Sequence, residues 1–222
     1  MAVQFTRLGK EIAIAVKSGG AHPETNSRLR TAIQNAKAVN MPKDRVEAAI
    51  KRASSKEEKD YEEIVYEGYA PHGVAVLVET ATDNTNRTVA NVRSYFNKVG
   101  GTLGKTGSLD FVFSRKSVFR FDPGEKDLEE LEFELIDAGL EELFVEADED
   151  GNDVAVIHTA FEDFGKMQKS LEEKGIEVKS AKLERIALST TEVNEEQAAD
   201  VFKLIDKLEE DDDVQAVYHN MA

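Results

Sequence analysis

The chain has 222 residues, of which 41% are hydrophobic, and this favours two or three small domains with buried cores over one large domain. It has no cysteine, which excludes a disulfide framework and thiolate metal sites and fits a reducing compartment. No apolar stretch approaches the roughly 20 residues that span a bilayer, and the N-terminus lacks the pattern of a signal peptide, so we expect no membrane association.

The net charge of −16 is distributed unevenly along the chain. Residues 1–56 hold 11 Lys/Arg against 4 Asp/Glu, whereas residues 57–121 hold 8 against 9 and residues 122–222 hold 9 against 31. One end is therefore basic and the other strongly acidic. This asymmetry indicates either a module that faces a polyanion or an ordinary solvated basic surface, and charge alone does not separate the two.

Residues 1–56 are predicted to form three short amphipathic helices that close a small bundle. Gly19-Gly20 ends the first helix, Asn26 caps the second, and Pro42 lies in the first turn of the third. The expected inner faces are Phe5, Leu8, Ile12, Ala15 and Val16, then Leu29, Ala32, Ile33 and Ala36, and then Val46, Ala49, Ile50 and Ala53. The outer faces would present Lys10, Lys17, Arg28, Arg30, Lys37, Lys43, Arg45, Lys51 and Arg52.

After a linker at 54–60, the sequence becomes β-rich. EEIVYEGYA (62–70) and GVAVLVETA (73–81) predict two adjacent strands. A helix with a regular apolar face is predicted over 82–100, and SLDFVF (108–113) predicts a further strand.

The start of that helix, TDNTNRT (82–88), combines several short polar side chains with one arginine. One of them, Thr82, Asp83 or Asn84, is enough to cap the helix. The surplus donors predict a functional surface as well. Its side chains Asn84, Asn86 and Arg87 would contact a phosphate, a sugar or a protein partner at the helix N-terminus. A capping loop with no further role is the alternative.

The stretch GGTLGKTG (100–107) resembles a phosphate-binding P-loop. That motif needs glycine, four residues, and then Gly-Lys-Ser/Thr. Here Gly104-Lys105-Thr106 supplies the end, but Val99 stands where the first glycine belongs. A P-loop also follows a strand and opens a helix, whereas here a helix comes first. We therefore predict a helix C-cap and a flexible turn, with Lys105 as a single charge that can touch a phosphate.

Residues 117–188 have the element order strand, helix, strand, strand, helix, strand, which is typical of a ferredoxin-like unit. The last predicted helix and strand would complete the sheet begun at 62–81. The fold is predicted to be α+β and multidomain, with an N-terminal three-helix bundle followed by two ferredoxin-like α+β domains, one inserted in the other. The predicted domains are 1–57, 58–116 with 189–222, and 117–188.

The sequence shows no catalytic or metal-binding motif. Its four histidines are scattered without paired ligands, and His72 is interpreted as a turn residue because no nucleophile accompanies it. DEDGND (148–153) has glycine at its fourth position, whereas an EF-hand loop has it at the sixth, so we predict a hairpin turn. We expect no enzymatic activity, no metal and no cofactor.

Three segments, 19–53, 66–93 and 100–113, resemble the YebC/PmpR family, whose eukaryotic relatives include the translational activator of mitochondrial cytochrome oxidase. The patterns NMPKDxVExAIK and YEGYxPxGVAxxVExxTDNxNRT are highly specific, and the similarity spans nearly the whole chain. The resemblance implies a helical first domain, two α+β domains and a non-enzymatic cytoplasmic factor in gene expression. Many members begin with a basic segment resembling GHSKWANIKHRK, which this sequence does not contain.

Members of the family are described as DNA-binding transcriptional regulators and also as ribosome-associated translation factors. The resemblance therefore implies a probable DNA-binding transcriptional regulator, with a translation factor that binds ribosomal RNA as the alternative. A protein-interaction module that uses the acidic region 122–222 is a third hypothesis. The predicted nucleic-acid-binding residues are the nine basic residues on the outer helix faces, together with Asn84, Asn86, Arg87 and Lys105.

Overall fold

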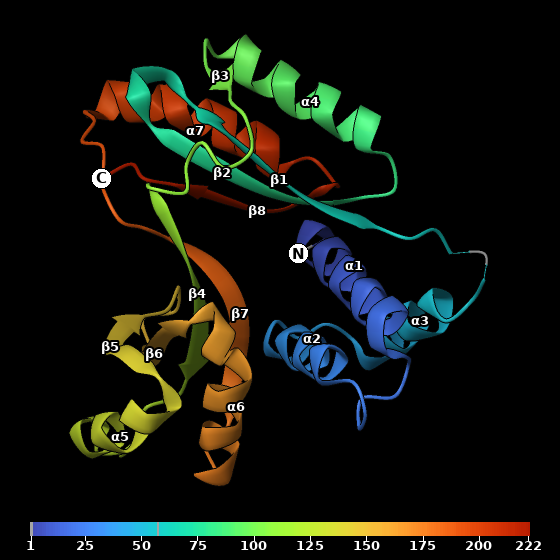
Figure 1. The fold of residues 1–222 in the computed structure, drawn as a ribbon, viewed down its shortest axis with the longest axis vertical. Helices are drawn as coiled ribbons and strands as arrows, with labels where there is room; N and C mark the ends of the chain where they lie inside the picture. Colours follow the sequence, from blue (N-terminus) through green and yellow to red (C-terminus); the bar gives the residue numbers. More distant parts are fainter. Residues whose placement is uncertain (1, 57) are drawn as a thin grey trace. The chain divides into compact units, whose positions relative to one another are not determined.

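A computed structural model describes residues 2–56 and 58–222, and its architecture is α+β, as predicted (Figure 1). The predicted linker 54–60 includes Glu57, which lies outside the described residues. The helices are α1 (Ala2–Gly19), α2 (Ser27–Ala38), α3 (Lys43–Ala53), α4 (Thr85–Lys98), α5 (Leu128–Leu135), α6 (Phe164–Glu173) and α7 (Glu195–Glu209). The strands are β1 (Glu62–Tyr69), β2 (Ala75–Thr82), β3 (Thr102–Leu103), β4 (Phe113–Phe121), β5 (Leu140–Ala147), β6 (Asp153–Ala160), β7 (Val178–Ala187) and β8 (Val214–His219). None of the described helices combines the length and apolar character of a membrane span.

The chain forms two compact units. The first contains the chain up to Ala32, Met41–Ser114 and Ile186–Ala222. The second contains Ile33–Asn40 and Arg115–Arg185. The helices α1 and α3 thus belong to the first unit, together with the sheet begun by β1.

The sheet of the first unit is antiparallel, with the strand order β3-β1-β2-β8. β8 pairs with β2 over Val76↔His219 to Thr80↔Val214, so the last strand of the chain completes the sheet begun by β1 and β2, as predicted. The helices α4 and α7 cover one face of this sheet (Figure 1). Their shared core consists of Ala70, Val74, Val76, Val78, Val92, Phe96, Val201, Leu204, Ile205, Leu208 and Val214.

The sheet of the second unit has the order β5-β6-β4-β7, which with α5 and α6 gives the predicted ferredoxin-like arrangement. Apolar side chains of both helices and of the sheet share one core, which includes Phe119, Leu135, Ile157, Met167 and Leu171. The end of α2 belongs to this unit as well. The Asn35 side-chain amide donates to the Ala181 carbonyl and accepts from the Ala181 N–H, both at 2.9 Å, at the edge of β7.

The three predicted N-terminal helices are confirmed, and so is the Asn26 cap, whose side-chain oxygen accepts the Leu29 N–H at 3.0 Å. The strand predicted at 108–113 is wrong. Residues 106–112 form turns, and β4 begins only at Phe113. The Val112 and Phe113 N–H groups both donate to the Leu109 carbonyl, which curls the backbone and buries Leu109.

The glycine stretch 100–107 follows the end of α4, and the predicted helix C-cap is confirmed. The stretch also contains the short strand β3, which pairs with β1 and was not predicted, before the chain enters a loop. Gly100 has φ +78°, and the Gly101 N–H donates to the Phe96 carbonyl at 2.9 Å, which closes α4 as a C-cap. No helix follows. The buried Glu67 carboxylate accepts the Gly107 N–H and, at 3.1 Å, the Ser108 N–H. An internal carboxylate therefore occupies the backbone donors that a phosphate would need.

We expect Glu67→Gln to destabilise the first unit by about 1–2 kcal/mol, because both loop N–H groups donate to one carboxylate oxygen and the neutral amide oxygen of Gln is a weaker acceptor than that charged oxygen. Urea unfolding followed by circular dichroism measures the change. Glu62→Gln, at an exposed position of the same strand, is the matched control. Equal stability of the two variants would show that the Glu67 contacts do not hold the loop.

Candidate nucleic-acid interface

The helix α3 carries basic side chains at four of its 11 positions. Pro42 precedes it with an extended backbone, Asp44 lies in its first turn, and Lys51 and Arg52 lie in its last, which matches the charge preference of the helix dipole. Val46 and Ala53 are buried and anchor one side of the helix. The basic side chains remain at exposed positions on the other sides.

A groove of about 450 Å³ lies between α1, α3 and the segment that follows α3. Its lining includes Phe5 and Gly9 of α1, Arg45 and Arg52 of α3, and Glu58 and Tyr61. Arg45 and Arg52 are seven residues apart, which is two helical turns, so they share one face of α3. Phe5 and Ala49 were predicted to lie inside the bundle, but both line this open groove and are only half-buried.

The other predicted basic residues fall into two groups: some have hydrogen-bond or ion-pair partners within the protein, and some have no ion pair. Lys17 donates to the Glu58 carbonyl at 2.9 Å, Arg28 pairs with Glu63 at 2.8 Å, and Arg30 donates to the Pro23 carbonyl at 3.0 Å. Lys43 lies 3.6 Å from Glu47 in an exposed pair, which contributes little. Of the predicted binding residues, Lys37, Arg45, Lys51, Arg52 and Lys105 are exposed and have no ion pair within the described chain. Lys37 lies in the second unit, and Lys105 lies in the loop that follows β3.

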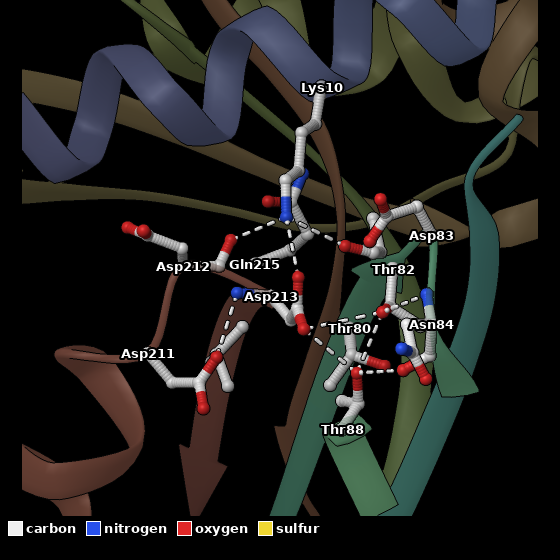
Figure 2. A network of polar contacts seen from close by, with 12 residues as sticks. Lys10, Thr80, Thr82, Asp83, Asn84, Thr88, Asp211, Asp212, Asp213 and Gln215 are labelled. Atoms are coloured by element: carbon white, nitrogen blue, oxygen red, sulfur yellow. Dashed lines mark hydrogen bonds and ion pairs between the residues drawn. The ribbon is translucent and has the colours of Figure 1, made fainter. Parts of the chain in front are cut away.

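The predicted exposure of Lys10 is wrong. The residue is only 9% exposed, and its ammonium group donates to the Ala81 and Asp212 carbonyls and pairs with the Asp213 carboxylate at 3.1 Å (Figure 2). Three acceptors account for all three donors of the ammonium group. Lys10 is therefore a structural residue and is not part of the proposed interface.

Asp213 is the buried acceptor around which this cluster is built. Its second oxygen accepts from Thr88 at 2.9 Å and from Arg87 at 2.7 and 3.2 Å (Figure 2 shows the threonine contact). Burial by itself would raise the pKa of Asp213, but the hydrogen bonds from Arg87, Thr88 and Lys10 outweigh it and lower that pKa below its usual value. Asp213 is therefore held as a carboxylate at neutral pH.

The predicted functional surface 82–88 is largely used internally. The Asn84 side chain caps α4 by accepting the Arg87 N–H at 3.0 Å. The Arg87 guanidinium contacts Asp83 as well as Asp213. Only Asn86 of the three predicted residues is exposed without a hydrogen bond in the described part of the chain. Asn84 is thus the cap among the three candidates that the sequence offered. Arg87 has a structural role that the sequence did not reveal, because Asp213 lies 126 positions away.

Sequence analysis also missed Gly9 and Tyr61 as groove residues. The signal for Gly9 was a glycine inside a helical pattern, which needs a packing or functional reason. For Tyr61 no sequence signal was available, because its position follows a linker. The described residues contain no group of three or more His, Asp or Glu that could hold a metal ion.

Comparisons with known proteins cover nearly the whole chain. Residues 1–56 match the model of the TACO1/YebC protein N-terminal domain, and residues 61–221 match that of the TACO1/YebC second and third domain. A protein from Cytophaga hutchinsonii (61% identity; 100% of this chain and 91% of the relative) is named "probable transcriptional regulatory protein". A protein from Myxococcus xanthus has the same name; it is 55% identical, and the match covers 100% of this chain and 92% of the relative. The crystal structure of a conserved hypothetical protein from Aquifex aeolicus has a TM-score of 0.83 at 41% identity and covers 100% of this chain and 90% of that one.

We expect Asp213→Asn to destabilise the first unit by about 3 kcal/mol at pH 7, because it leaves Lys10 buried without its counter-ion. The pKa of Asp213 in the folded protein lies below its value of about 3.9 in the unfolded chain. The stability that the Asp213 carboxylate contributes is therefore complete above about pH 3.9 and is lost as the pH falls through the folded pKa. The stability difference between the two proteins should therefore narrow below about pH 4.

Urea unfolding at a series of pH values measures this difference. Asp212→Asn is the control, because the Asp212 side chain is exposed and only its backbone carbonyl accepts from Lys10. A difference that stayed constant down to pH 3 would contradict the assignment of the charged group to Asp213.

Proposed function

Since the chain belongs to the TACO1/YebC family, we propose that it is a non-enzymatic, nucleic-acid-binding regulator of gene expression that acts on DNA in transcription. The names of the relatives from C. hutchinsonii and M. xanthus support the regulatory role. We place its action in the cytoplasm, where it would meet its nucleic acid. The physical support for binding comes from the charges of α3.

The observation that carries the proposal is the set of exposed basic side chains on α3. Arg45, Lys51 and Arg52 have no ion pair among the described residues, and Lys43 has only a weak one. Basic side chains that are not neutralised by the protein can contact phosphates and release the counter-ions that surround them. Such contacts provide affinity and orientation but do not read the base sequence.

The second unit is expected to stay away from nucleic acid. Residues 122–163 contain 17 Asp/Glu and a single Lys, so this stretch has a net charge of −16. Repulsion between this acidic stretch and phosphate would favour binding of the nucleic acid to the first unit. A protein partner that binds the acidic region 122–222 stays a separate hypothesis.

We expect replacement of Lys43, Arg45, Lys51 and Arg52 by Gln to flatten the dependence of duplex affinity on salt. Each lost phosphate contact should reduce the slope of log K against log salt by about 0.9. Folding should change little because the four positions are exposed. Fluorescence anisotropy with a labelled duplex at several salt concentrations measures the slope.

The matched control replaces Lys166, Lys169, Lys179 and Lys182 by Gln, which changes the net charge equally at exposed positions of the second unit. An equal effect of both sets would mean that only net charge matters, and this would contradict the assignment to α3.

The target itself is tested in a cell lysate that contains both ribosomes and chromosomal DNA. The proposal expects the protein to recover promoter DNA after crosslinking, and to lose it when the four α3 residues are replaced. Co-sedimentation with ribosomes in place of DNA recovery would contradict the transcriptional role and would favour ribosomal RNA as the target.

A further inference from the structure

The groove between α1 and α3 has properties that contact with phosphates alone does not require. Phosphate binding needs exposed cations, whereas this groove also has aromatic walls and a concave shape of about 450 Å³. Ligand pockets in proteins usually range from about 300 to 1,000 Å³, and a single nucleotide falls within the lower part of that range. The groove is therefore large enough for one nucleotide.

Two aromatic rings line the groove, and each is paired with a cation. The Arg45 guanidinium lies 5.5 Å from the centre of the Phe5 ring and is free to contact a ligand. The Lys10 ammonium lies 5.3 Å from the centre of the Tyr61 ring, but its charge is neutralised by Asp213, so Tyr61 contributes its ring alone. Unpaired nucleobases stack on aromatic rings and on guanidinium planes. A surface that combines both with positive charge is typical of proteins that bind single strands.

The charges are arranged on different sides of the groove. Arg45 and Arg52 come from α3, whereas the carboxylate of Glu58 comes from the segment before β1. A phosphate is attracted by the two arginines and repelled by the Glu58 carboxylate. The backbone of a bound strand is therefore expected along α3, with its base directed towards Phe5 and Tyr61.

Gly9 gives an independent indication that a ligand occupies the groove. Glycine destabilises the interior of a helix, and α1 extends well beyond Gly9 on both sides. A Cβ atom built on Gly9 has no heavy atom within 4 Å, so close packing does not explain the glycine. Its missing side chain leaves free space in the wall of the groove.

We propose that this groove binds one unpaired base of a single-stranded nucleic acid, between Phe5 and Tyr61, with the adjacent phosphate at Arg45 and Arg52. This inference rests on the proposed nucleic-acid binding and narrows its target to strands with unpaired bases. A base inside a duplex is stacked on its neighbours and cannot enter the groove, so duplexes would use only the phosphate contacts.

The test uses the full chain and four probes of about ten nucleotides, which fits the usual site size for single strands. These are oligo-uridine, oligo-thymidine, an abasic strand with the same phosphates, and a duplex. Fluorescence anisotropy should show that at least one of the base-bearing strands binds about fivefold or more tighter than the abasic strand. Base dependence with either sugar supports the proposal.

Gly9→Leu fills the groove from a position where a side chain meets no neighbour, so the fold should be retained. It should reduce binding of the base-bearing strand to the level of the abasic strand and leave duplex binding unchanged. Gly165→Leu is the matched control, because Gly165 is also a helical glycine with no heavy atom within 4 Å of its Cβ position, but lies on α6. Phe5→Leu, which removes the ring and keeps an apolar side chain, provides a second variant.

The outcomes separate the groove from the general function. Equal affinity for abasic and base-bearing strands, or unaltered binding by both Gly9→Leu and Phe5→Leu, would overturn the groove assignment and leave phosphate binding intact. Failure of the wild-type protein to bind any of the four probes, even at low salt, would overturn both proposals. As an independent readout, strands with 5-iodouracil should crosslink to Phe5 or Tyr61 under ultraviolet light, and crosslinks found only elsewhere would count against the groove.

Discussion

The buried ion pair between Lys10 and Asp213 is the constraint on which the first unit depends. It joins two residues 203 positions apart, and Asp213 also holds Arg87 and Thr88 at the start of α4. Arg7, one turn before Lys10, adds hydrogen bonds to the Val214 and Glu209 carbonyls. A single carboxylate thus connects α1, α4 and the turn before β8. The position of α1, and with it one wall of the groove, is set by this connection.

The chain uses its positive charges in two distinct ways, which a count of Lys and Arg does not separate. Lys10 and Arg87 neutralise a buried carboxylate inside the protein. Arg45 and Arg52 remain at the surface beside aromatic rings. The excess of positive charge in the first 56 residues therefore overstates the charge that is available to a ligand. The distinction depends on partners that are distant in sequence.

Local patterns were enough to predict most helices and strands, because periodicity and capping act over a few residues. The Asn26 cap and the end of α4 just before Gly100 are examples. The errors came from long-range contacts. Residues 108–113 have strand-like composition, but the Glu67 carboxylate, about 40 positions away, fixes the neighbouring loop and the segment turns instead. In the same way, nothing near Lys10 in the sequence indicates that its partner is Asp213.

The contact between Asn35 and Ala181 has a consequence for how the protein behaves in a crowded solution. An edge strand normally exposes unpaired N–H and C=O groups that can recruit a strand from another molecule and start aggregation. At this edge of β7, a side-chain amide presents the same donor and acceptor as a neighbouring strand would. A helix thereby protects the sheet without extending it. The opposite edge strand of this sheet is β5, where Glu141, Glu142 and Glu146 discourage the addition of another strand.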